Sequence, residues 1–408
     1  KLLKRFYCNN RILFYNFYIY IYMKIAILKH WGYNENYVNL LNRLIPNISI
    51  KLINSNGEFN NNNEEFKKSE DFNSDDFIKS TNGNIGNLTY EISLFIFLKK
   101  HFNLTCIYIV DIISLKSCKN FIKPDYLILT PANTLHNKCL KFMKYLYELK
   151  NLINCKTIIA SFGSQNMTEL NNEYLGIIKK LCDQNTLTLV RDKNSYNLLK
   201  NHIPNLYSSG CPAIFLDYKN RINDIINNSI RVKNLITENR KINILIYPSP
   251  ISLININNKL IEIINLFNYS NINFIIMSEI NDFKLILNED FKTNHTEFEK
   301  ILLKNDSLLT FDLDKHIEYI YDKNIDICFS TILHGTSIAI NCGIPTINLS
   351  IDNRTKYCLE KWKIPESYYL DLIDKNKILS LLNQYDSTFI DNVNDIEKSF
   401  IDYISLHQ

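Results

Sequence analysis

Glycine is scarce in this chain, with nine glycines among 408 residues. Because glycine accepts left-handed and closely packed backbone positions that other residues avoid, the few present are expected where backbone geometry demands them. They fall mainly in predicted turns or at the ends of predicted strands and helices: Gly32, Gly83, Gly86, Gly163, Gly210, Gly335 and Gly343. Their positions therefore mark the turns from which a functional site would be built.

Several sequence signatures of catalysis are also absent. The chain contains no Walker loop, no complete G-x-G-x-x-G, no H-E-x-x-H, no G-x-S-x-G and no carboxylate cluster with metal-ligand spacing. Each of these patterns supplies a phosphate cradle, a metal site or an activated nucleophile. Their absence from the sequence argues against a nucleotide hydrolase, a metalloprotease and a serine hydrolase, and no metal site is expected.

Cysteine usage and charge narrow the class of protein further. Ten cysteines are scattered without a C-x-x-C pair, mostly in apolar contexts typical of buried free thiols. This usage indicates a reducing compartment, and we expect a cytoplasmic protein.

The net charge of +4 is diffuse, with no basic stripe, which argues against a nucleic-acid partner. The apolar run 12–22 is shorter than the ~20 residues that span a bilayer, so no integral membrane segment is expected.

The length of the chain predicts two domains, each large enough to bury its own core. Met23 directly precedes a good first strand, so residues 1–22 are interpreted as a non-native or disordered extension. The tract around NNNNEEFKK has too few apolar residues to pack and is interpreted as a flexible loop. The predicted divisions are an N-terminal Rossmann-like domain at 23–217 with its loop at 54–80, a linker at 218–240, and a C-terminal Rossmann-like domain with closing C-terminal helices at 241–408.

Apolar runs typical of buried strands alternate with helical patterns in both halves. The strands predicted in the first half are 24–28, 49–53, 105–110, 126–130, 157–161 and 186–190. Those predicted in the second half are 242–247, 273–277, 308–311, 325–329 and 346–349. This alternation implies an α/β fold with two parallel sheets, wrapped on both faces and facing each other across a cleft. Ligands are expected at the carboxyl edges of the strands.

The most informative stretch is IDICFSTILHGTSIAINCGIPTINLS, which reads as strand, turn, helix and strand. Ser330 and Thr331 end the first strand, and His334 falls near the start of the helix that follows. Free amides and the helix dipole at such a junction favour an anion. His334 is therefore predicted to bind or protonate a phosphate-bearing ligand, and the alternative is a capping or core-packing histidine.

Arg191 is a second candidate because it directly follows the predicted strand 186–190. The next residue, Asp192, is placed to cap the helix that follows, which directs Arg191 toward the cleft. A guanidinium offers a flat fork of donors that suits phosphate or carboxylate better than lysine does. The alternative is a structural ion pair with a neighbouring carboxylate.

Two further clusters carry weaker signals. The glycine turn 83–87 could bring Asn84 and Asn87 against a ligand, with Glu91 one helical turn beyond; the alternative is a tight turn followed by a solvated helix residue. Arg354 and Lys356 stand at the head of a predicted helix, where cations oppose the dipole and an external anion could compensate them. The alternative for this pair is a solvated charged face.

Four segments in this order resemble the polysaccharide pyruvyl transferase family: NGNIGNLTYEISLF, IIASFGSQN, TLVRDKNSYNLL with the later GCPAIFL, and STILHGTSIAINCGIPTINLSIDNR. Together they span residues 82–365, most of the chain. The resemblance implies a two-domain fold like that of GT-B glycosyltransferases. It also implies transfer of a pyruvyl group from phosphoenolpyruvate to a sugar hydroxyl pair of a cell-surface glycan or its lipid-linked precursor, as in exopolysaccharide biosynthesis. The product is a cyclic ketal, phosphate is lost, and no cofactor beyond the co-substrate is implied.

The resemblance assigns roles to the candidate residues. It implies that His334 is the acid and Glu91 the base. The implied donor-binding residues are Arg191, Thr331, Gly335, Thr336, Arg354 and Lys356. The implied acceptor-binding residues are Asn84, Asn87 and Ser161.

Two positions depart from the family pattern. Ile332 stands where many members carry arginine in Arg-Leu-His, and Asn87 follows Gly86 where an aspartate is common. These departures leave open a degenerate member that only binds glycans. The tandem α/β plan and the glycine-proline turn after the helix leave open a GT-B glycosyltransferase that uses a nucleotide sugar.

Overall fold

The structure is a computed structural model, and it describes most of the chain outside the predicted extension and loop. The described residues are 23–28, 41–43, 45–53, 59–61, 85–110, 124–131, 134–164, 169–216, 221–248, 254–276, 296–309, 313–350 and 353–407. The predicted extension 1–22 lies outside them, as does the predicted loop 54–80 apart from a short strand at Phe59–Asn61. Within the described residues, no helix is long and apolar enough to cross a bilayer.

The first unit is built on an eight-stranded sheet in the order β3-β2-β4-β1-β5-β6-β7-β8. Its strands are β1 (Met23–Leu28), β2 (Ser49–Ile53), β3 (Phe59–Asn61), β4 (Leu104–Val110), β5 (Tyr126–Leu129), β6 (Lys156–Phe162), β7 (Thr186–Val190) and β8 (Leu206–Ser208). Its helices are α3 (Ile85–Phe102), α5 (Leu140–Ile153), α6 (Asn172–Leu181) and α7 (Lys193–Leu199), with short 3₁₀ segments η1 (Asn137–Cys139) and η2 (Pro212–Phe215). Apart from the antiparallel edge strand β3, the strands pair in parallel, as predicted.

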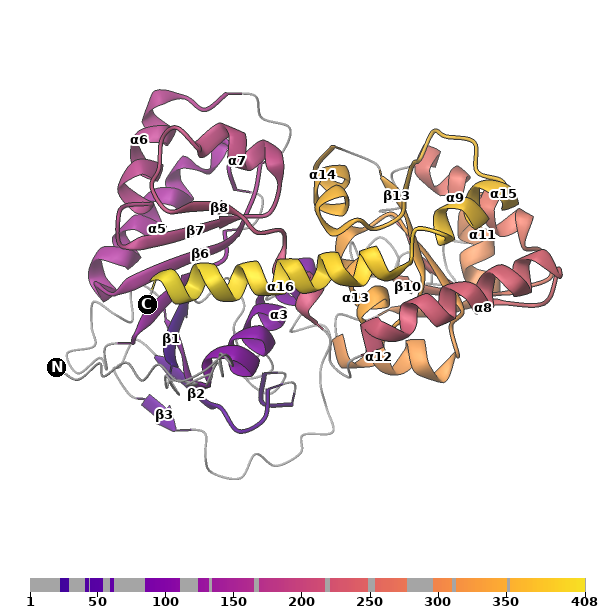
Figure 1. Cartoon of the computed structure of the whole chain (residues 1–408), viewed down its shortest axis with the longest axis horizontal. Helices are drawn as coiled ribbons and strands as arrows, with labels where there is room; N and C mark the ends of the chain where they lie inside the picture. Colours follow the sequence, from indigo (N-terminus) through magenta and orange to yellow (C-terminus); the bar gives the residue numbers. More distant parts are fainter. Residues whose placement is uncertain are drawn as a thin grey trace, which may run out of the picture.

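Both faces of this sheet are covered, which explains why its strands read as continuous apolar runs. Along β6, Ile158 and Ala160 join the core on the side of α3. Ile159 and Phe162 point the other way and join the core formed with α5 and α6. The sheet is therefore the middle layer of three, and function can be placed only at its edges (Figure 1).

The second unit is a six-stranded, fully parallel sheet in the order β11-β10-β9-β12-β13-β14. Its strands are β9 (Asn243–Tyr247), β10 (Asn271–Ile276), β11 (Asp306–Leu309), β12 (Ile327–Ser330), β13 (Thr346–Ser350) and β14 (Glu366–Tyr368). Its helical segments are η3 (Arg221–Asp224), α8 (Ile225–Thr237), α9 (Ile254–Leu266), α11 (Glu297–Lys304), α12 (Leu313–Asp322), α13 (Leu333–Asn341), α14 (Asn353–Trp362) and α15 (Lys375–Leu382). The strand order reverses between β9 and β12, and this is the point at which doubly wound sheets bind ligands.

The predicted linker at 218–240 differs from the structure, which forms η3 and the helix α8 over much of it. The residues buried from α8 are Ile225, Ser229, Val232 and Ile236, a spacing of three to four residues that makes one apolar stripe. Ser229 Oγ also donates to the carbonyl of Leu382 at 2.7 Å. Asparagines between these positions dilute the helical pattern, so the sequence predicted a linker here and no helix.

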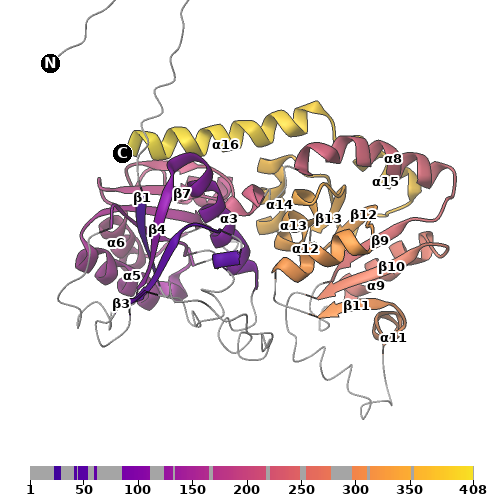
Figure 2. The ribbon, with the colours of Figure 1, turned by 90° about the horizontal axis from the view of Figure 1, so that it is seen from below.

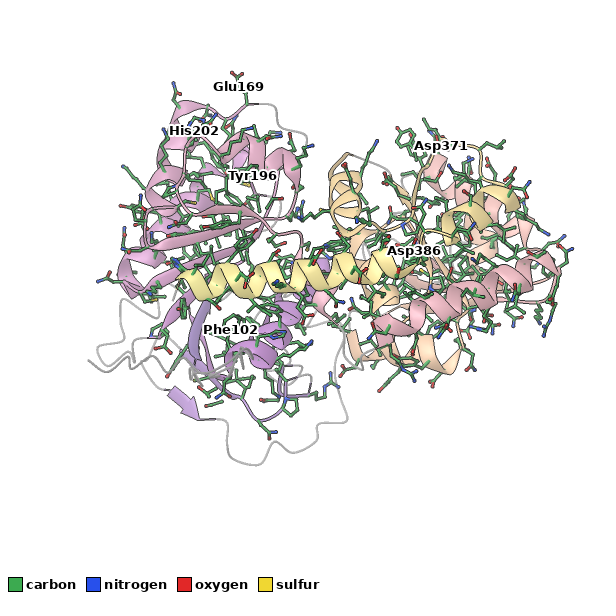
Figure 3. The ribbon with its side chains drawn as sticks, viewed as in Figure 1. Phe102, Glu169, Tyr196, His202, Asp371 and Asp386 are labelled. Carbon is green, nitrogen blue, oxygen red and sulfur yellow. The ribbon has the colours of Figure 1, made fainter. Side chains whose placement is uncertain are left out.

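The last helix, α16 (Ser387–His407), runs from the second unit across to the first (Figures 1 and 2). Figure 3 labels Asp386, whose Oδ1 accepts from the Thr388 amide at 2.9 Å, at the start of this helix. On the second unit, Asn392 Nδ2 donates to the carbonyl of Lys361 at 3.1 Å. On the first, Tyr403 stacks on Tyr207 with ring centroids 4.1 Å apart. One helix therefore fastens both units.

Glu397 makes the ionic part of this attachment. Its Oε1 lies 2.7 Å from His101 Nε2 and 2.8 Å from Lys100 Nζ at the end of α3. The hydrogen bond from His101, with the bond and charge of Lys100, lowers the pKa of Glu397 to about 2, although burial opposes the shift. Stabilisation by this carboxylate is therefore complete above its ordinary pKa of 4.5 and is lost as the pH falls through about 2.

Glu397→Gln is expected to lower the free energy of unfolding at pH 7 by about 1 kcal/mol, because a partly buried charge-assisted contact is removed. The difference from the wild type should shrink as urea titrations are repeated toward pH 3. Asp391→Asn, at an exposed position of the same helix, is the matched control. A pH-independent loss for Glu397→Gln would show that packing rather than charge holds this contact.

Candidate anion-binding site between the two sheets

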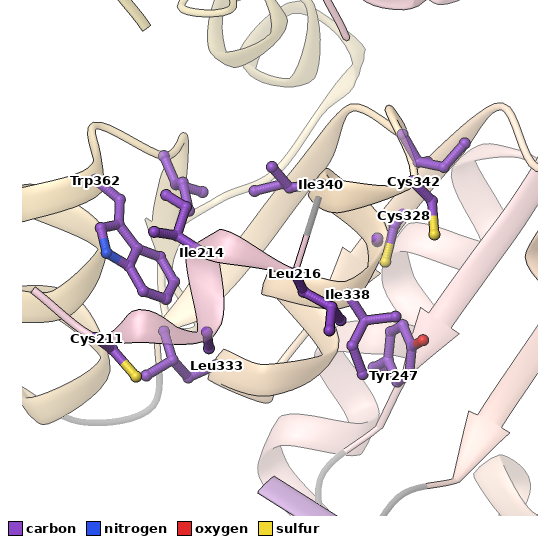
Figure 4. Close-up of a cluster of buried hydrophobic side chains, with 14 of the residues drawn as sticks. Cys211, Ile214, Leu216, Tyr247, Cys328, Leu333, Ile338, Ile340, Cys342 and Trp362 are labelled. Carbon is purple, nitrogen blue, oxygen red and sulfur yellow. The ribbon is translucent and has the colours of Figure 1, made fainter. Parts of the chain in front are cut away.

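A short segment after β8 joins the two units beside the carboxyl edges of their strands. η2 packs against α3 on one side and α13 on the other. Asn341 Nδ2 of α13 donates to the carbonyl of Ala213 in η2 at 3.2 Å. Figure 4 shows Leu333 of α13 beside Cys211, the residue directly before η2. Through these contacts η2 links α3 to α13.

Arg191 follows β7 and enters this region as a buried cation. Its side chain is 2% exposed, and its amide donates to the carbonyl of Phe162 at 3.1 Å. In the part of the chain that the structure describes, neither Nε nor Nη2 has a hydrogen-bond partner. A buried guanidinium with unmade hydrogen bonds is costly unless an anion satisfies it.

The neighbouring carboxylate, Asp192, does not satisfy this arginine closely. Asp192 Oδ2 is 3.8 Å from Arg191 Nε, beyond hydrogen-bond range. Its oxygens instead accept from the Ser195 amide at 2.7 Å and the Ser195 hydroxyl at 2.8 Å, which caps α7 as the sequence predicted. The structural ion pair is thus present but long, and Nε and Nη2 of Arg191 have no hydrogen-bond partner among the residues that the structure describes.

His334 lies in the first turn of α13, at the carboxyl edge of the second sheet. The helix begins after Ile332, an N-cap residue without a side-chain cap. Ser330 Oγ accepts from the Ile332 amide at 3.1 Å, which ends the strand and turns the chain. The imidazole is partly buried, unlike a core histidine, and lies at the amide-rich end of the helix.

Gly335 lets this helix start lie directly on β9. A Cβ at this position would come within 2.5 Å of Cγ of Tyr247, the last residue of β9. The carbonyl of Tyr247 accepts from the Thr331 amide at 3.0 Å and the Thr331 hydroxyl at 3.1 Å. The turn that carries His334 is therefore tied to the strand at which the sheet order reverses.

Tyr90, on α3, lies beside His334. Its ring centroid is 6.0 Å from that of His334, and its hydroxyl donates to the carbonyl of Thr130 at 3.1 Å. Burial raises the pKa of Tyr90 well above its ordinary value, and the charge of Arg191 acts in the opposite direction. His334 of the second unit thus lies beside a buried tyrosine of the first unit, and the charge of Arg191 acts on the same hydroxyl.

Glu91 lies beside Tyr90 and is 3% exposed, so it is not a solvated helix residue. It accepts a hydrogen bond from Thr130 Oγ1 at 3.3 Å. Ser161 is fully buried, with φ of 60° and its Oγ 3.4 Å from Cys211 Sγ. Burial raises the pKa of Cys211, so this thiol stays protonated near neutral pH. The Ser161 hydroxyl is turned into the protein rather than toward an acceptor.

The other predicted ligand residues divide into three groups. Thr331 and Thr336 are buried, and their hydroxyls donate within the protein, Thr336 Oγ1 to the carbonyl of Ile332 at 3.1 Å. They shape the turn rather than present hydroxyls to a ligand. Lys356 is exposed on α14. Asn84 lies outside the described residues, and the structure describes only the backbone of Asn87 and Arg354.

Sequence reasoning missed two residues of this site, Tyr90 and Tyr247. Both are buried aromatics whose importance depends on which elements meet, and neither spacing nor charge marks them. Only an indirect signal pointed to Tyr247. Gly335 is one of the few glycines of the chain, and it stands where the backbone of α13 lies against the Tyr247 ring.

A groove with a cavity volume of about 620 Å³ lies at the amino edge of the second sheet, opposite the edge that carries His334. Two of its cations are paired within the groove: Arg231 Nη1 bonds to Asp326, and Arg221 Nη1 bonds to Asp224 at 2.8 Å. The ends of α12 and α13 also reach this groove, where helix dipoles favour cations without any ligand. Its basic lining is therefore explained by the fold.

Comparisons with known proteins add the following. The chain matches a family model described as polysaccharide pyruvyl transferase over residues 13–353. A comparison with curated proteins gives no match. Similar solved structures include UDP-GlcNAc 2-epimerase of Methanocaldococcus jannaschii in complex with UDP-GlcNAc and UDP, with 14% identity, a TM-score of 0.40, and coverage of 88% of this chain and 92% of that one. Accessory secretory protein 1,2 and 3 of Streptococcus pneumoniae has 13% identity and a TM-score of 0.33; the match covers 79% of this chain and 54% of that chain, about half its length.

Proposed function

Because the chain belongs to the polysaccharide pyruvyl transferase family, we propose that it transfers a pyruvyl group from phosphoenolpyruvate to two hydroxyls of a saccharide. Two carbon–oxygen bonds form at C2 of the donor, and its bond to the phosphate oxygen breaks. Of the two hydroxyl protons, one is balanced by protonation of the methylene carbon and the other by the departing phosphate. The product is a cyclic ketal on a cell-surface glycan or its lipid-linked precursor.

The observation that carries this proposal is the buried Arg191 with open donors. Phosphoenolpyruvate bears a phosphate and a carboxylate, and either would supply oxygens to Nε and Nη2. The uncapped amides at the start of α13, beside His334 and Gly335, provide a second set of donors. Ile332 packs partly buried against the core, so it adds no cation where many family members have arginine.

His334 acts in this proposal as the acid that protonates the methylene carbon or assists the departure of phosphate. Glu91 serves as the base for an acceptor hydroxyl, because it is a carboxylate held near Tyr90 at the same edge. Asn84 and Asn87, before and within the start of α3, contact the acceptor. Arg354 and Lys356 add positive charge beside the donor. Ser161, predicted to bind the acceptor, takes no direct part in this proposal because its hydroxyl faces Cys211.

The direct test is phosphate release from phosphoenolpyruvate with a panel of saccharide and lipid-linked saccharide acceptors. We expect release that depends on the acceptor, together with a pyruvate ketal in the product by mass spectrometry. Turnover of a nucleotide sugar without phosphoenolpyruvate would instead identify a glycosyltransferase. Binding of glycans without turnover of any donor would identify a degenerate member.

A further inference from the structure

We propose that Gly163 is a positioning residue for Arg191. In this view, the missing side chain at position 163 lets the guanidinium lie against the backbone that follows β6. The inference rests on the proposed function for the identity of the anion, but not for the contact itself. It accounts for one of the few glycines in the chain, within the segment IIASFGSQN.

The space at Gly163 is already occupied by the arginine. A Cβ built on Gly163 would lie 2.2 Å from Arg191 Nε, 2.8 Å from Cζ and 2.9 Å from Cδ. Such distances are well inside van der Waals contact. Gly163 does not have the positive φ found at Gly210 and Gly343, so conformation alone does not require a glycine there. The requirement comes from the close approach of the side chain.

The backbone at Gly163 has no freedom to retreat. Its carbonyl accepts from the Leu135 amide at 3.1 Å, and the next amide, of Ser164, donates to Ser195 Oγ at 2.8 Å. Just before it, the pairing of β6 with β7 shifts register between Ile159 and Phe162, where a residue with positive φ bulges the strand. These ties hold the segment from both sides.

The arginine has little room to move either, since its side chain is 2% exposed. Ser195 links the two segments, because the hydroxyl that accepts from the Ser164 amide also donates to Asp192 Oδ2 at 2.8 Å. Asp192 directly follows Arg191 in the chain. A methyl group at position 163 would therefore displace the guanidinium rather than be absorbed. Displacement by about 1 Å is enough to cost a catalytic contact on the order of 100-fold.

The experiment compares Gly163→Ala with Gly176→Ala. Gly176, on α6, has no heavy atom within 4 Å of the Cβ position, so it receives the same methyl group without a contact. We expect Gly163→Ala to lower kcat/KM for phosphoenolpyruvate about 100-fold and to lose the rise in Tm that inorganic phosphate or phosphoenolpyruvate gives the wild type. Gly176→Ala should keep both and be slightly more stable.

A double-mutant cycle separates positioning from a purely structural role. Gly163→Ala should lower the ligand-free Tm by roughly 5 °C in the wild-type background. In an Arg191→Ala background most of this loss should disappear, because the methyl group then has space. Equal losses in both backgrounds, or a Gly163→Ala variant with wild-type kcat/KM, would overturn the proposal.

The outcomes also distinguish this inference from the proposed function. If the wild type neither turns over phosphoenolpyruvate nor gains stability from it, the proposed function fails. The ligand-free cycle still decides whether Gly163 and Arg191 are coupled. If the wild type is active and the two changes prove independent, only the positioning role fails.

Discussion

We expect Arg191→Met to lower donor-dependent phosphate release strongly while leaving the fold at least as stable as the wild type. The expected fall in kcat/KM for phosphoenolpyruvate is about 100- to 1000-fold or more, the range for removing a charge-stabilising donor from an enclosed site. Among the described residues, the guanidinium is 2% exposed and its Nε and Nη2 have no hydrogen-bond partner, so methionine removes a desolvation cost. Stability should therefore be unchanged or higher by up to about 3 kcal/mol.

Two further substitutions sharpen this test. Arg191→Lys keeps the charge but loses the planar fork, and we expect intermediate activity. Arg240→Met removes an exposed arginine, paired with Glu238 at 3.5 Å, and should change neither activity nor stability appreciably. The measurements are steady-state phosphate release and urea denaturation. A strongly destabilised Arg191→Met protein would mean that the long contact with Asp192 is structural after all.

We expect His334→Gln to lower kcat by about 100- to 10,000-fold, the usual range for loss of a general acid. The fold should be almost unaffected, because the imidazole is partly buried and glutamine is compatible with the first turn of a helix. The apparent affinity for phosphoenolpyruvate should change little, since Arg191 and the α13 amides remain. Single-turnover phosphate release separates the chemical step from product release.

The matched control is His202→Gln, an exposed histidine on the outer side of the first unit (Figure 3). It should behave as the wild type in every assay. If His334→Gln retains wild-type phosphate release, the imidazole is not the acid. In that case its contact with Tyr90 would be the reason for its position.

Local patterns predicted the sheets well, because a buried parallel strand is recorded in its own sequence as a short apolar run. The start of α13 was also predictable, since strand, hydroxyl turn and helix are consecutive in the chain. Arg191 could be placed at a strand end for the same reason. What these patterns could not show is which side chains from separate elements meet.

Burial of the site residues depends on contacts between segments that are distant in the sequence, and local patterns could not predict these contacts. The alternative interpretation of Glu91, as a solvated helix residue, could be excluded only once α3 was found against η2 and α13. Ser161 looked like an acceptor ligand, but a bulge in β6 turns its hydroxyl toward Cys211. The helix α8 was hidden by asparagines between its apolar positions. Each case is a tertiary effect that overrides a local reading.

The helix α16 restricts how far the two units can move against each other when a ligand binds. Because this helix is anchored to the second unit through Asn392 and to the first through Glu397 and Tyr403, rotating one unit against the other must bend the helix or break those anchors. The distance between Arg191 and His334 is therefore largely fixed before a ligand binds. Little binding free energy need then be spent on bringing the two halves into register.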